Sequence, residues 1–441
     1  MIKTRKRLSS FQIILIGFAL VILVGAILLS LPFSSAKGEY TPFVDSLFTS
    51  TSAVCVTGLV VFDTATHWSV FGQVVILLLI QIGGMGVVTV AMSFAMLAGK
   101  KVGLTSRGLM QEAISAPNVG GILKLTGFII KGVFLIELLG ALIMMPSFIS
   151  DFGAEGIWMA IFHSISAFCN AGFDIMGKTG EFSSLTAYSA HPVINITIML
   201  LIIIGGIGFL TWDDVRRNKF RFRKYRLQSK IIFIVTGLLI LLPAIYMFFF
   251  EFQSLPLGER ILVSLFQAVT LRTAGFNTID YTTVSQVGLL LTIVLMLIGG
   301  SPGSTAGGMK TTTFAVIFST MFSVFRRRNN TKLLNRRVED GIVKNAFSIF
   351  MLYITLFVLS ASIISVVEEL PLLECMFETA SAVGTVGLSL GLTPTLGILS
   401  KIILMFLMFF GRVGGLTLIY AAFSRKNTNI SKLPMENVTV G

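Results

Sequence analysis

The chain has 441 residues, of which 54% are hydrophobic and only 12% are charged, and its formal net charge is +13 at pH 7. Several charge-free apolar runs reach the roughly 20 residues that a membrane-spanning helix needs, so the composition excludes a soluble globular protein and predicts a polytopic membrane protein. The positive charge does not indicate nucleic-acid binding, because the basic residues cluster in the loops between apolar runs, as in the cytoplasmic loops of membrane proteins.

The first apolar run, 11–31, follows a basic amino terminus. It is longer than the apolar part of a signal peptide, which has about 7–15 residues, so we interpret it as a retained first span. The next segment, 43–54, is too short to cross a bilayer and predicts a half-helix that enters the membrane and returns. A second span is predicted at 70–98.

This order of span, half-helix and span recurs three more times along the chain. The predicted segments are 125–149, 156–168 and 192–212 in the second repeat, 231–250, 258–270 and a span beginning near 286 in the third, and 345–367, 372–382 and 396–422 in the fourth. We therefore divide the chain into repeats at 1–100, 101–218, 219–335 and 336–424, followed by a cytosolic tail at 425–441.

Acidic residues stand near the start of each predicted half-helix. They are Asp45, Glu155, Glu259 and Glu374. A carboxylate is favourable at the positive, N-terminal end of a helix, although ordinary acids at the membrane interface would give the same pattern.

Basic residues are unevenly divided between the two sides of the predicted spans. The basic loops are 100–124, 216–230 and 326–344, whereas the loops on the other side contain mainly Lys37, Lys178 and Arg260. This imbalance predicts a multi-pass protein of the cell membrane with both termini in the cytoplasm. The half-helices then all enter from outside, and all four repeats run in the same direction.

A short motif of small and apolar residues ends each half-helix with a glycine and a further apolar residue. The glycines are Gly58, Gly172, Gly275 and Gly387, and their separations are 172 − 58 = 114, 275 − 172 = 103 and 387 − 275 = 112 residues. A regular internal repeat of this kind guides the fold prediction more strongly than any local motif.

Glycine at these positions has a chemical explanation. Non-helical backbone at membrane depth must be buried in protein or line a water-filled cavity. Four loops that meet on one axis can direct carbonyl oxygens at a dehydrated cation, and glycine permits the required backbone angles without a side chain in the path. The alternative is that the glycines only let helices approach closely, but four matching positions favour the pore.

The predicted second spans also carry glycines, which allow a helix to bend or to pack closely behind a loop. The clusters begin at Gly83, Gly205, Gly299 and Gly411. In the third repeat the stretch 299–310 contains so many small residues, with a proline, that it cannot continue a helix. The sequence predicts a break in this span alone. It is not a phosphate-binding loop, because no strand precedes it and its lysine is one position late.

These features together resemble the Trk/Ktr/HKT superfamily of potassium transporters over essentially the whole chain, and KtrB-type membrane subunits of bacterial Ktr systems most of all. The resemblance implies an all-α fold of four tandem M1–P-loop–M2 repeats around one central pore, similar to a potassium channel made from one chain. The implied function is potassium uptake across the cell membrane. No nucleophile–base pair or metal-ligand cluster is visible in the sequence, so we expect no enzymatic activity.

The same resemblance implies the partners. It predicts a homodimer in membrane lipid, placed on a cytosolic ring of KtrA-type nucleotide-binding subunits that respond to ATP and ADP. No nucleotide site is visible in this chain, so ATP and ADP are expected only on the partner subunit. The chain itself is expected to hold no cofactor, only the transported K⁺ at the filter carbonyls, and no nucleic acid.

The resemblance also assigns the site residues. The implied selectivity filter is Val56, Thr57, Gly58, Asn170, Ala171, Gly172, Thr273, Ala274, Gly275, Thr385, Val386 and Gly387. The implied gating loop is Gly299, Gly300, Ser301, Pro302, Gly303, Ser304, Thr305, Ala306, Gly307, Gly308, Met309 and Lys310, with Arg412 near it. Relatives with serine at the first filter position admit sodium more readily, so Gly58 implies a preference for potassium.

Two features depart from the family pattern. The third loop is one residue shorter than the others between Phe266 and its glycine, and Arg272 lies three residues before Gly275. We expect Arg272 to point away from the axis and to pair with an acid such as Glu378. From its depth in the last span, Arg412 is expected to bind carbonyls of the 299–310 loop and hold it across the pore.

The alternative function is a secondary cation transporter with an alternating-access site at the membrane midplane. Such transporters commonly have inverted repeats and broken helices in matching halves. The parallel repeats and the single predicted break favour the channel-like pore.

Overall fold

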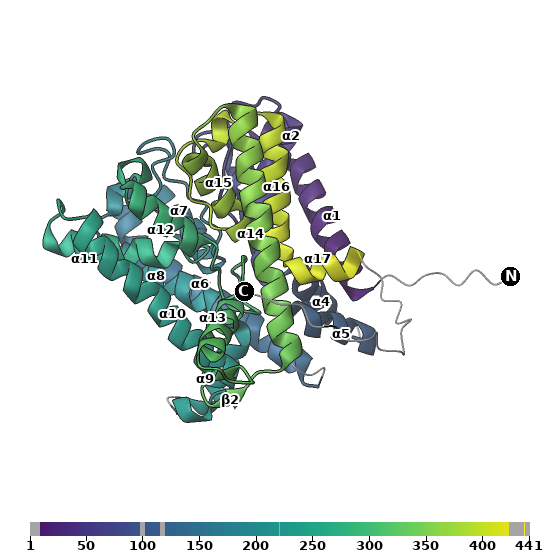
Figure 1. The fold of residues 1–441 in the computed structure, drawn as a ribbon. Helices are drawn as coiled ribbons and strands as arrows, with labels where there is room; N and C mark the ends of the chain where they lie inside the picture. Colours follow the sequence, from purple (N-terminus) through teal and green to yellow (C-terminus); the bar gives the residue numbers. More distant parts are fainter. Residues whose placement is uncertain (1–8, 98–101, 115–119, 220, 423–435, 437–441) are drawn as a thin grey trace.

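The computed structural model describes residues 9–97, 102–114, 120–219, 221–422 and 436. The predicted all-α fold is confirmed, because the described chain is built from helices and one short hairpin (Figure 1). The hairpin pairs β1 (Lys332–Leu333) with β2 (Arg336–Arg337) in an antiparallel sense. Much of the predicted tail, 425–441, lies outside the described residues.

The helices follow the predicted order in each repeat. The first helices are α1 (Ser10–Ser30), α6 (Ile122–Phe152), α10 (Leu227–Tyr246) and α14 (Asp340–Glu368). The half-helices are α2 (Phe43–Cys55), α7 (Glu155–Phe168), α11 (Leu257–Thr270) and α15 (Leu372–Gly384). The second helices are pairs: α3 (Val70–Met85) with α4 (Val87–Leu97), α8 (Pro192–Gly206) with α9 (Phe209–Asn218), α12 (Gln286–Met296) with α13 (Thr311–Phe325), and α16 (Ile398–Val413) with α17 (Gly415–Ala422).

Shorter elements connect these helices. Helix α5 (Leu104–Ile114) lies between the first and second repeats, and a π-helical turn, Met247–Glu251, extends α10. Single 3-10 turns are found at Pro32–Ser34, Thr186–Tyr188, Phe222–Lys224, Tyr281–Thr283 and Thr393–Thr395.

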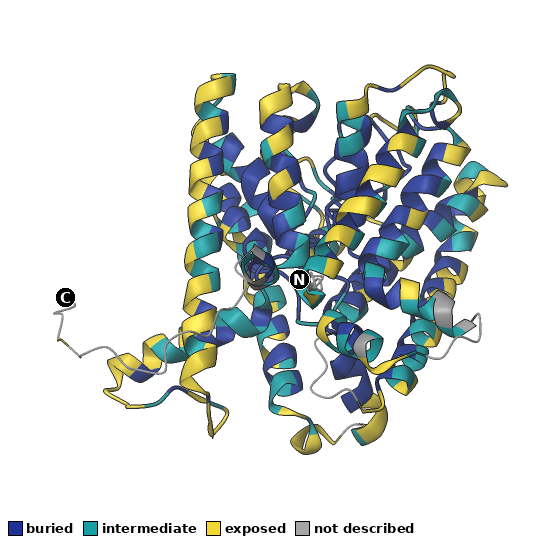
Figure 2. Ribbon diagram, turned by 90° about the vertical axis from the view of Figure 1, so that its right-hand side faces the viewer, coloured by how far each residue is buried: buried dark blue, intermediate teal, exposed yellow. Residues whose placement is uncertain are grey.

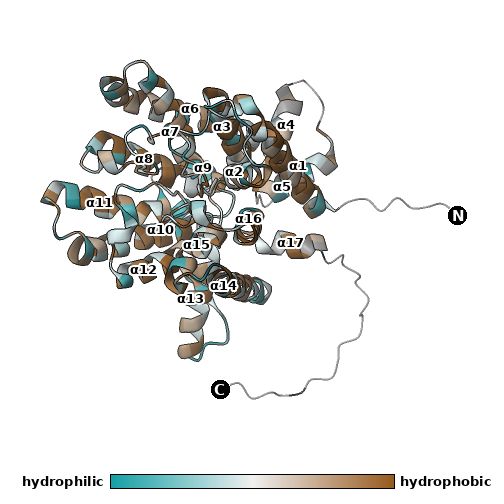
Figure 3. Ribbon diagram, turned by 90° about the horizontal axis from the view of Figure 1, so that it is seen from above, coloured by the Kyte–Doolittle hydropathy of each residue, from teal (hydrophilic) through white to brown (hydrophobic). Residues whose placement is uncertain are grey.

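Four described helices are long and apolar enough to cross a membrane: α1, α6, α14 and α10 with its π-helical turn. The outer surface of the bundle exposes many large apolar side chains, such as Leu20 at 59% and Leu242 at 62% (Figure 2). Seen from above, hydrophobic residues predominate on the helices (Figure 3). A soluble protein rarely exposes such a continuous apolar surface, so this surface fits contact with lipid.

The second helices of the first, second and fourth repeats were expected to be continuous, and this prediction was wrong. Helices α3 and α4 meet at 98°, and α8 and α9 meet at 96°. A glycine with positive φ stands at each junction, at Gly86 (+85°), Gly208 (+91°) and Gly414 (+89°). Residues other than glycine rarely adopt this conformation. Continuous apolar sequence therefore concealed three breaks beside the one between α12 and α13.

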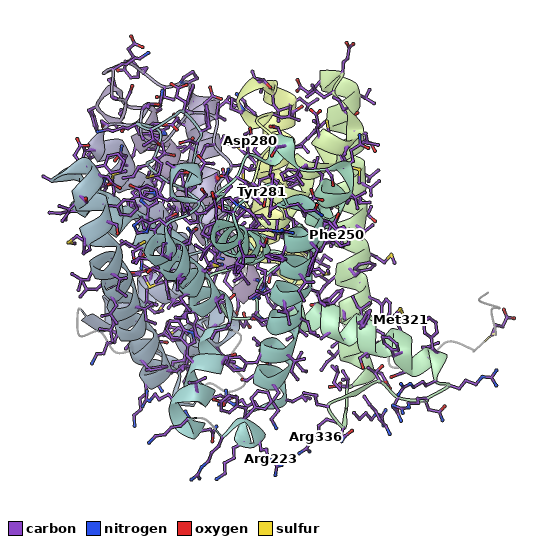
Figure 4. All side chains as sticks on the ribbon, turned by 90° about the vertical axis from the view of Figure 1, so that its left-hand side faces the viewer. Arg223, Phe250, Asp280, Tyr281, Met321 and Arg336 are labelled. Carbon is purple, nitrogen blue, oxygen red and sulfur yellow. The ribbon has the colours of Figure 1, made fainter. Side chains whose placement is uncertain are left out.

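The half-helices begin with the acids expected there. Asp45, Glu155, Glu259 and Glu374 each lie in the first turn of their helix. Figure 4 shows Arg223 and Arg336 at one end of the bundle and Asp280 at the opposite end. The basic loops 216–230 and 326–344 thus share one end, as the charge pattern predicted.

Candidate functional site

The four loop glycines form a closed ring, although they are 103 to 114 residues apart in the sequence. A Cβ atom added to each glycine would lie less than 3.0 Å from a carbonyl oxygen of a neighbouring loop. These oxygens belong to Ala171 for Gly58, to Ala274 for Gly172, to Val386 for Gly275 and to Thr57 for Gly387. Backbone atoms cannot rotate away from a side chain, so the ring has room only for glycine.

The four loops share one backbone conformation. The glycines have φ values of +95°, +68°, +80° and +94° in chain order. The residues two positions earlier are also left-handed, with φ of 57° at Val56, 58° at Asn170, 64° at Thr273 and 52° at Thr385. Such angles cost energy in residues other than glycine and occur most often at functional sites. Their repetition in all four loops shows that the loops are equivalent parts of one site.

The third loop is one residue shorter in the turn between α11 and Gly275. In three loops the amide that precedes the glycine donates to the carbonyl five residues earlier, as from Ala171 to Ser166 at 2.8 Å. In the third loop Ala274 donates to Thr270, four residues earlier, at 3.0 Å. The turn after α11 is therefore one residue tighter, and Gly275 still reaches its place in the ring.

Buried hydroxyl groups also lie in these loops. The hydroxyls of Thr57, Thr273 and Thr385 have no hydrogen-bond partner among the described residues. Buried polar atoms are normally paired, so unpaired oxygens beside a ring of carbonyls suit the binding of a cation.

A cavity of about 610 Å³ opens on one side of the ring, and all four glycines line it. Asp63, Asp174, Glu181 and Asp280 line it as well. Burial raises the pKa of the Asp174 carboxyl to about 6, and the nearby charge of Asp63 acts in the same direction. The cavity therefore concentrates negative charge, which attracts cations to the ring.

The 299–310 stretch packs against the loops that carry the ring. Its Thr305 hydroxyl lies 2.9 Å from the side-chain oxygen of Asn170 and 3.1 Å from the carbonyl oxygen of Phe168. The stretch therefore contacts the second loop. Its backbone is paired mainly with the neighbouring second helices. Ser301 donates to Gly206 at 3.0 Å, Thr305 donates to Gly205 at 3.3 Å, and Gly308 donates to Gly411 at 3.1 Å. The glycine clusters of the second and fourth repeats thus accept backbone hydrogen bonds from this loop.

The side chain of Lys310 folds back on the loop instead of standing free. Its ammonium donates to the carbonyls of Ala306 at 2.8 Å and Gly307 at 3.2 Å. Lys310 and Arg412 both line a smaller cavity of about 170 Å³.

The Arg412 guanidinium connects the 299–310 loop to the end of α3. One terminal nitrogen donates to the carbonyl of Thr305 in the 299–310 loop. The other donates to the carbonyls of Gly83 and, at 3.0 Å, Gly84, in the last turn of α3 before its bend. The sequence suggested the contact with the loop but not the contact with α3. Helix α3 ends at the bend at Gly86, and the last carbonyls of a helix have no intrahelical partner, so these carbonyls can accept from Arg412.

The expected pair between Arg272 and Glu378 is not formed. Arg272 is buried, and its Nε and one terminal nitrogen have no hydrogen-bond partner among the described residues. The Glu378 carboxylate instead accepts hydrogen bonds from Ser389, from the Leu390 amide at 3.2 Å and from Thr393 at 2.8 Å. These donors lie in the loop after the fourth glycine, so Glu378 is already satisfied by its own repeat.

Two buried polar contacts between helices of different repeats were missed by the sequence prediction. Lys401 of α16 pairs with Asp45 of α2 at 2.8 Å, with both side chains largely buried. Glu137 of α6 accepts a hydrogen bond from Gln81 of α3 at 3.2 Å, and the Cys169 sulfur lies 3.9 Å from its carboxylate. An ionisable residue within an apolar span is a functional candidate by default, and this signal was present in the sequence at Glu137 and Lys401.

Comparisons with known proteins agree with this arrangement. The sequence pattern of the TrkH family, described as "Cation transport protein", matches residues 4–430. The chain is 40% identical over 451 residues to the potassium/sodium uptake protein NtpJ of Enterococcus hirae, covering 100% of this chain and 99% of the relative. It is 38% identical over 431 residues to the Ktr system potassium uptake protein B of Bacillus subtilis, covering 96% and 95%.

A solved structure shares the fold. The crystal structure of the potassium transporter TrkH from Vibrio parahaemolyticus matches with a TM-score of 0.74 and 19% identity. The match covers 96% of this chain and 86% of the other.

Proposed function

Because the chain belongs to the TrkH family of cation transport proteins, we propose that it takes up potassium through a channel-like pore. The observation that carries the proposal is the closed ring of Gly58, Gly172, Gly275 and Gly387, which gives four loops one shared conformation around one axis. Potassium as a transported ion is supported by the names of two relatives, a potassium/sodium uptake protein of Enterococcus hirae and a Ktr system potassium uptake protein of Bacillus subtilis.

In this proposal the ring is the selectivity filter. Carbonyl oxygens of the four loops replace the hydration shell of K⁺, and the unpaired hydroxyls of Thr57, Thr273 and Thr385 supply further oxygens. The left-handed residues Val56 and Asn170 turn the chain so that successive carbonyls line the path. The acidic cavity beside the ring raises the local cation concentration before an ion is bound.

The 299–310 loop is the gate in this proposal. It contacts the second filter loop through Thr305. It has few bulky side chains that would fix its conformation by packing. Arg412 and Lys310 hold it through carbonyl oxygens alone. Because Arg412 also binds α3 before its bend, a movement of α3 or α16 would break this contact and weaken the hold on the loop, which α8 and α16 also bind through backbone hydrogen bonds. Cytosolic partners that move these helices would therefore open the pore.

The same proposal places the chain in a larger assembly. The name "Ktr system", carried by the Bacillus subtilis relative, implies more than one component. We assign the chain a homodimeric state on a cytosolic ring of KtrA-type nucleotide-binding subunits, where ATP or ADP would bind. In this proposal the end of the bundle that carries Arg223 and Arg336 (Figure 4) faces the cytoplasm. We also assign both termini to the cytoplasm from the charge pattern.

One observation favours the alternative function. All four second helices are broken, whereas the sequence predicted one break, and broken helices are also found at the substrate sites of alternating-access transporters. The parallel order of the repeats and the ring of four equivalent loops favour the pore. Measurements of passive conduction distinguish a channel-like pore from an alternating-access transporter.

The filter assignment is tested with Gly58→Ser. The added side chain meets the second loop, and Gly58 has φ of +95°, so the filter must change shape. We expect a lower potassium-to-sodium permeability ratio in reconstituted bilayers. Gly38→Ser is the matched control, because Gly38 also has positive φ (+71°) but has no atom within 4 Å of its Cβ position. Equal ratios in wild type, Gly38→Ser and Gly58→Ser would reject the filter.

A further inference from the structure

An apolar groove of about 540 Å³ lies between α10, α12 and α13, closed at one end by the β1–β2 hairpin. It exists because the break after α12 lets α13 separate from the rest of its span. Its lining includes Leu238, Leu242, Leu291, Leu295, Phe318 and Leu333. Leu238 and Leu242 are at least half exposed, so the groove opens on the apolar surface that faces lipid.

The hairpin end of this groove carries excess positive charge. Six basic residues lie between positions 326 and 337. Arg337 pairs with Asp340 at 3.3 Å, and none of the other five has an ion-pair partner in the described part of the chain. Clusters of four to eight basic residues directly beside a membrane helix attract anionic lipids. These exposed cations are therefore available to an anionic headgroup at the membrane surface.

The hairpin places one of these cations at the groove. Leu333, which lines the groove, is the cross-strand partner of Arg336, so the two side chains lie on the same face of the hairpin. Arg337 and Lys332 form the other pair, on the opposite face. The Ser319 hydroxyl of α13 donates to the Lys332 carbonyl at 2.6 Å and fixes the hairpin to the groove. Figure 4 shows Arg336 exposed below α13, whose Met321 is labelled.

We propose that this groove binds one anionic phospholipid of the cytoplasmic leaflet, with an acyl chain between α10 and α13 and its phosphate at Arg336. The apolar lining fits the chain, and the unpaired cations fit the headgroup. A second copy of this protein fits less well, because a two-fold interface would include the same basic patch from both copies and so double its excess positive charge. Like charges at short distance repel, whereas a phosphate neutralises them.

The site also bears on the gate, and this part of the inference rests on the proposed function. Helix α13 begins directly after the 299–310 loop, and the Thr311 amide donates to the Gly300 carbonyl at 3.0 Å. A lipid between α10 and α13 fixes the distance between these helices. It thereby fixes one end of the loop, so bound lipid sets the flux through the gate.

Lipid binding is tested on the full purified chain by native mass spectrometry. The probes are phosphatidylglycerol and phosphatidylcholine with identical acyl chains. Removing one basic residue near the membrane surface lowers binding by about fivefold. We expect this loss for phosphatidylglycerol with Arg336→Gln and no loss with Arg337→Gln, which changes the opposite face of the same hairpin. Equal losses in both variants would overturn the assignment of the headgroup.

The acyl chain is tested with Leu242→Trp, which fills the groove, and with Leu241→Trp as its control. Both leucines are exposed, at 62% and 56%, but only Leu242 lines the groove. We expect Leu242→Trp alone to reduce retention of both lipids. If Leu242→Trp instead disrupts dimerisation and leaves lipid retention unchanged, a second copy covers the groove and the proposal is wrong.

Flux measurements separate the site from the proposed function. In vesicles containing phosphatidylglycerol, Arg336→Gln should change potassium flux relative to Arg337→Gln, and in pure phosphatidylcholine the two should be equal. Altered binding with unaltered flux would contradict the link to the gate. If the wild-type protein conducts no potassium in either lipid, the proposed function is wrong. The lipid site is then decided by the native mass spectrometry alone.

Discussion

Replacing Arg412 by alanine tests the gate most sharply, because this side chain is the contact that joins the 299–310 loop to α3. It donates to the carbonyls of Thr305, Gly83 and Gly84. A hydrogen bond to a charged group contributes about 1.5–3 kcal/mol. Loss of the bond to Thr305 alone would shift the balance between closed and open loop by about 10- to 150-fold toward open.

The substitution should not harm insertion of the helix. An arginine at the bilayer centre costs about 2.5–3.5 kcal/mol on insertion scales, and alanine removes that cost. The change therefore affects the loop more than the fold. Arg412→Lys retains the positive charge but not the planar set of donors that reaches two elements, so it should give an intermediate effect.

The assay is potassium flux into liposomes without cytosolic partners. We expect Arg412→Ala, and a deletion within 303–308, to conduct more than wild type in this partner-free state. Dimerisation and thermal unfolding of each variant serve as controls for folding. If both variants fold normally and conduct no more than wild type, the 299–310 loop is not the gate.

Three further predictions concern the surroundings of the filter. Burial raises the pKa of Asp174 to about 6 from its ordinary 3.8. The carboxyl therefore loses its charge as external pH falls through about 6, and potassium uptake should fall with it. The raised pKa also means that folding stability decreases as pH rises from 3.8 to about 6. Both dependences should vanish in Asp174→Asn, and an unchanged pH profile in that variant would exclude this role. Glu137→Gln keeps a polar partner for Gln81 and should retain potassium selectivity, whereas Glu137→Ala should lose part of it in bi-ionic measurements, and equal selectivity would exclude a positioning role. Lys401→Met leaves Asp45 unpaired and should lower unfolding stability by about 3–5 kcal/mol, as breaking a buried ion pair does; thermal unfolding within error of wild type would show that the pair is solvated.

The sequence was informative wherever four copies of a feature could be compared. The family resemblance is confirmed by the match over residues 4–430, and the acids at the starts of the half-helices lie where they were expected. The spacing of Gly58, Gly172, Gly275 and Gly387 reflects a ring that only a repeated fold can form.

The bends at Gly86, Gly208 and Gly414 were not predictable from the same reasoning. Apolar residues surround each glycine cluster, so hydropathy shows one span, and glycines in a membrane helix also allow close packing without a bend. Only the tertiary contacts select the positive φ at these positions. The second contact of Arg412 depends on the first of these bends, and it was missed for that reason.

Arg272 shows a different limit of sequence reasoning. Its expected partner, Glu378, is taken by donors in its own repeat, which no charge pattern could indicate. Hydroxyl and amide donors can satisfy the oxygens of a buried carboxylate without an arginine. Counting charges therefore overestimated the pairing between repeats.

The reversal potential of the wild-type protein in a planar bilayer tests the central claim most directly. With a tenfold potassium gradient and no other gradient, a passive potassium-selective pore predicts a reversal potential of about 59 mV, the value for a tenfold ratio of a singly charged ion. Adding a sodium or proton gradient should leave that value nearly unchanged. A reversal potential that moves with the sodium or proton gradient in a fixed ratio would show coupled transport and contradict the channel-like pore.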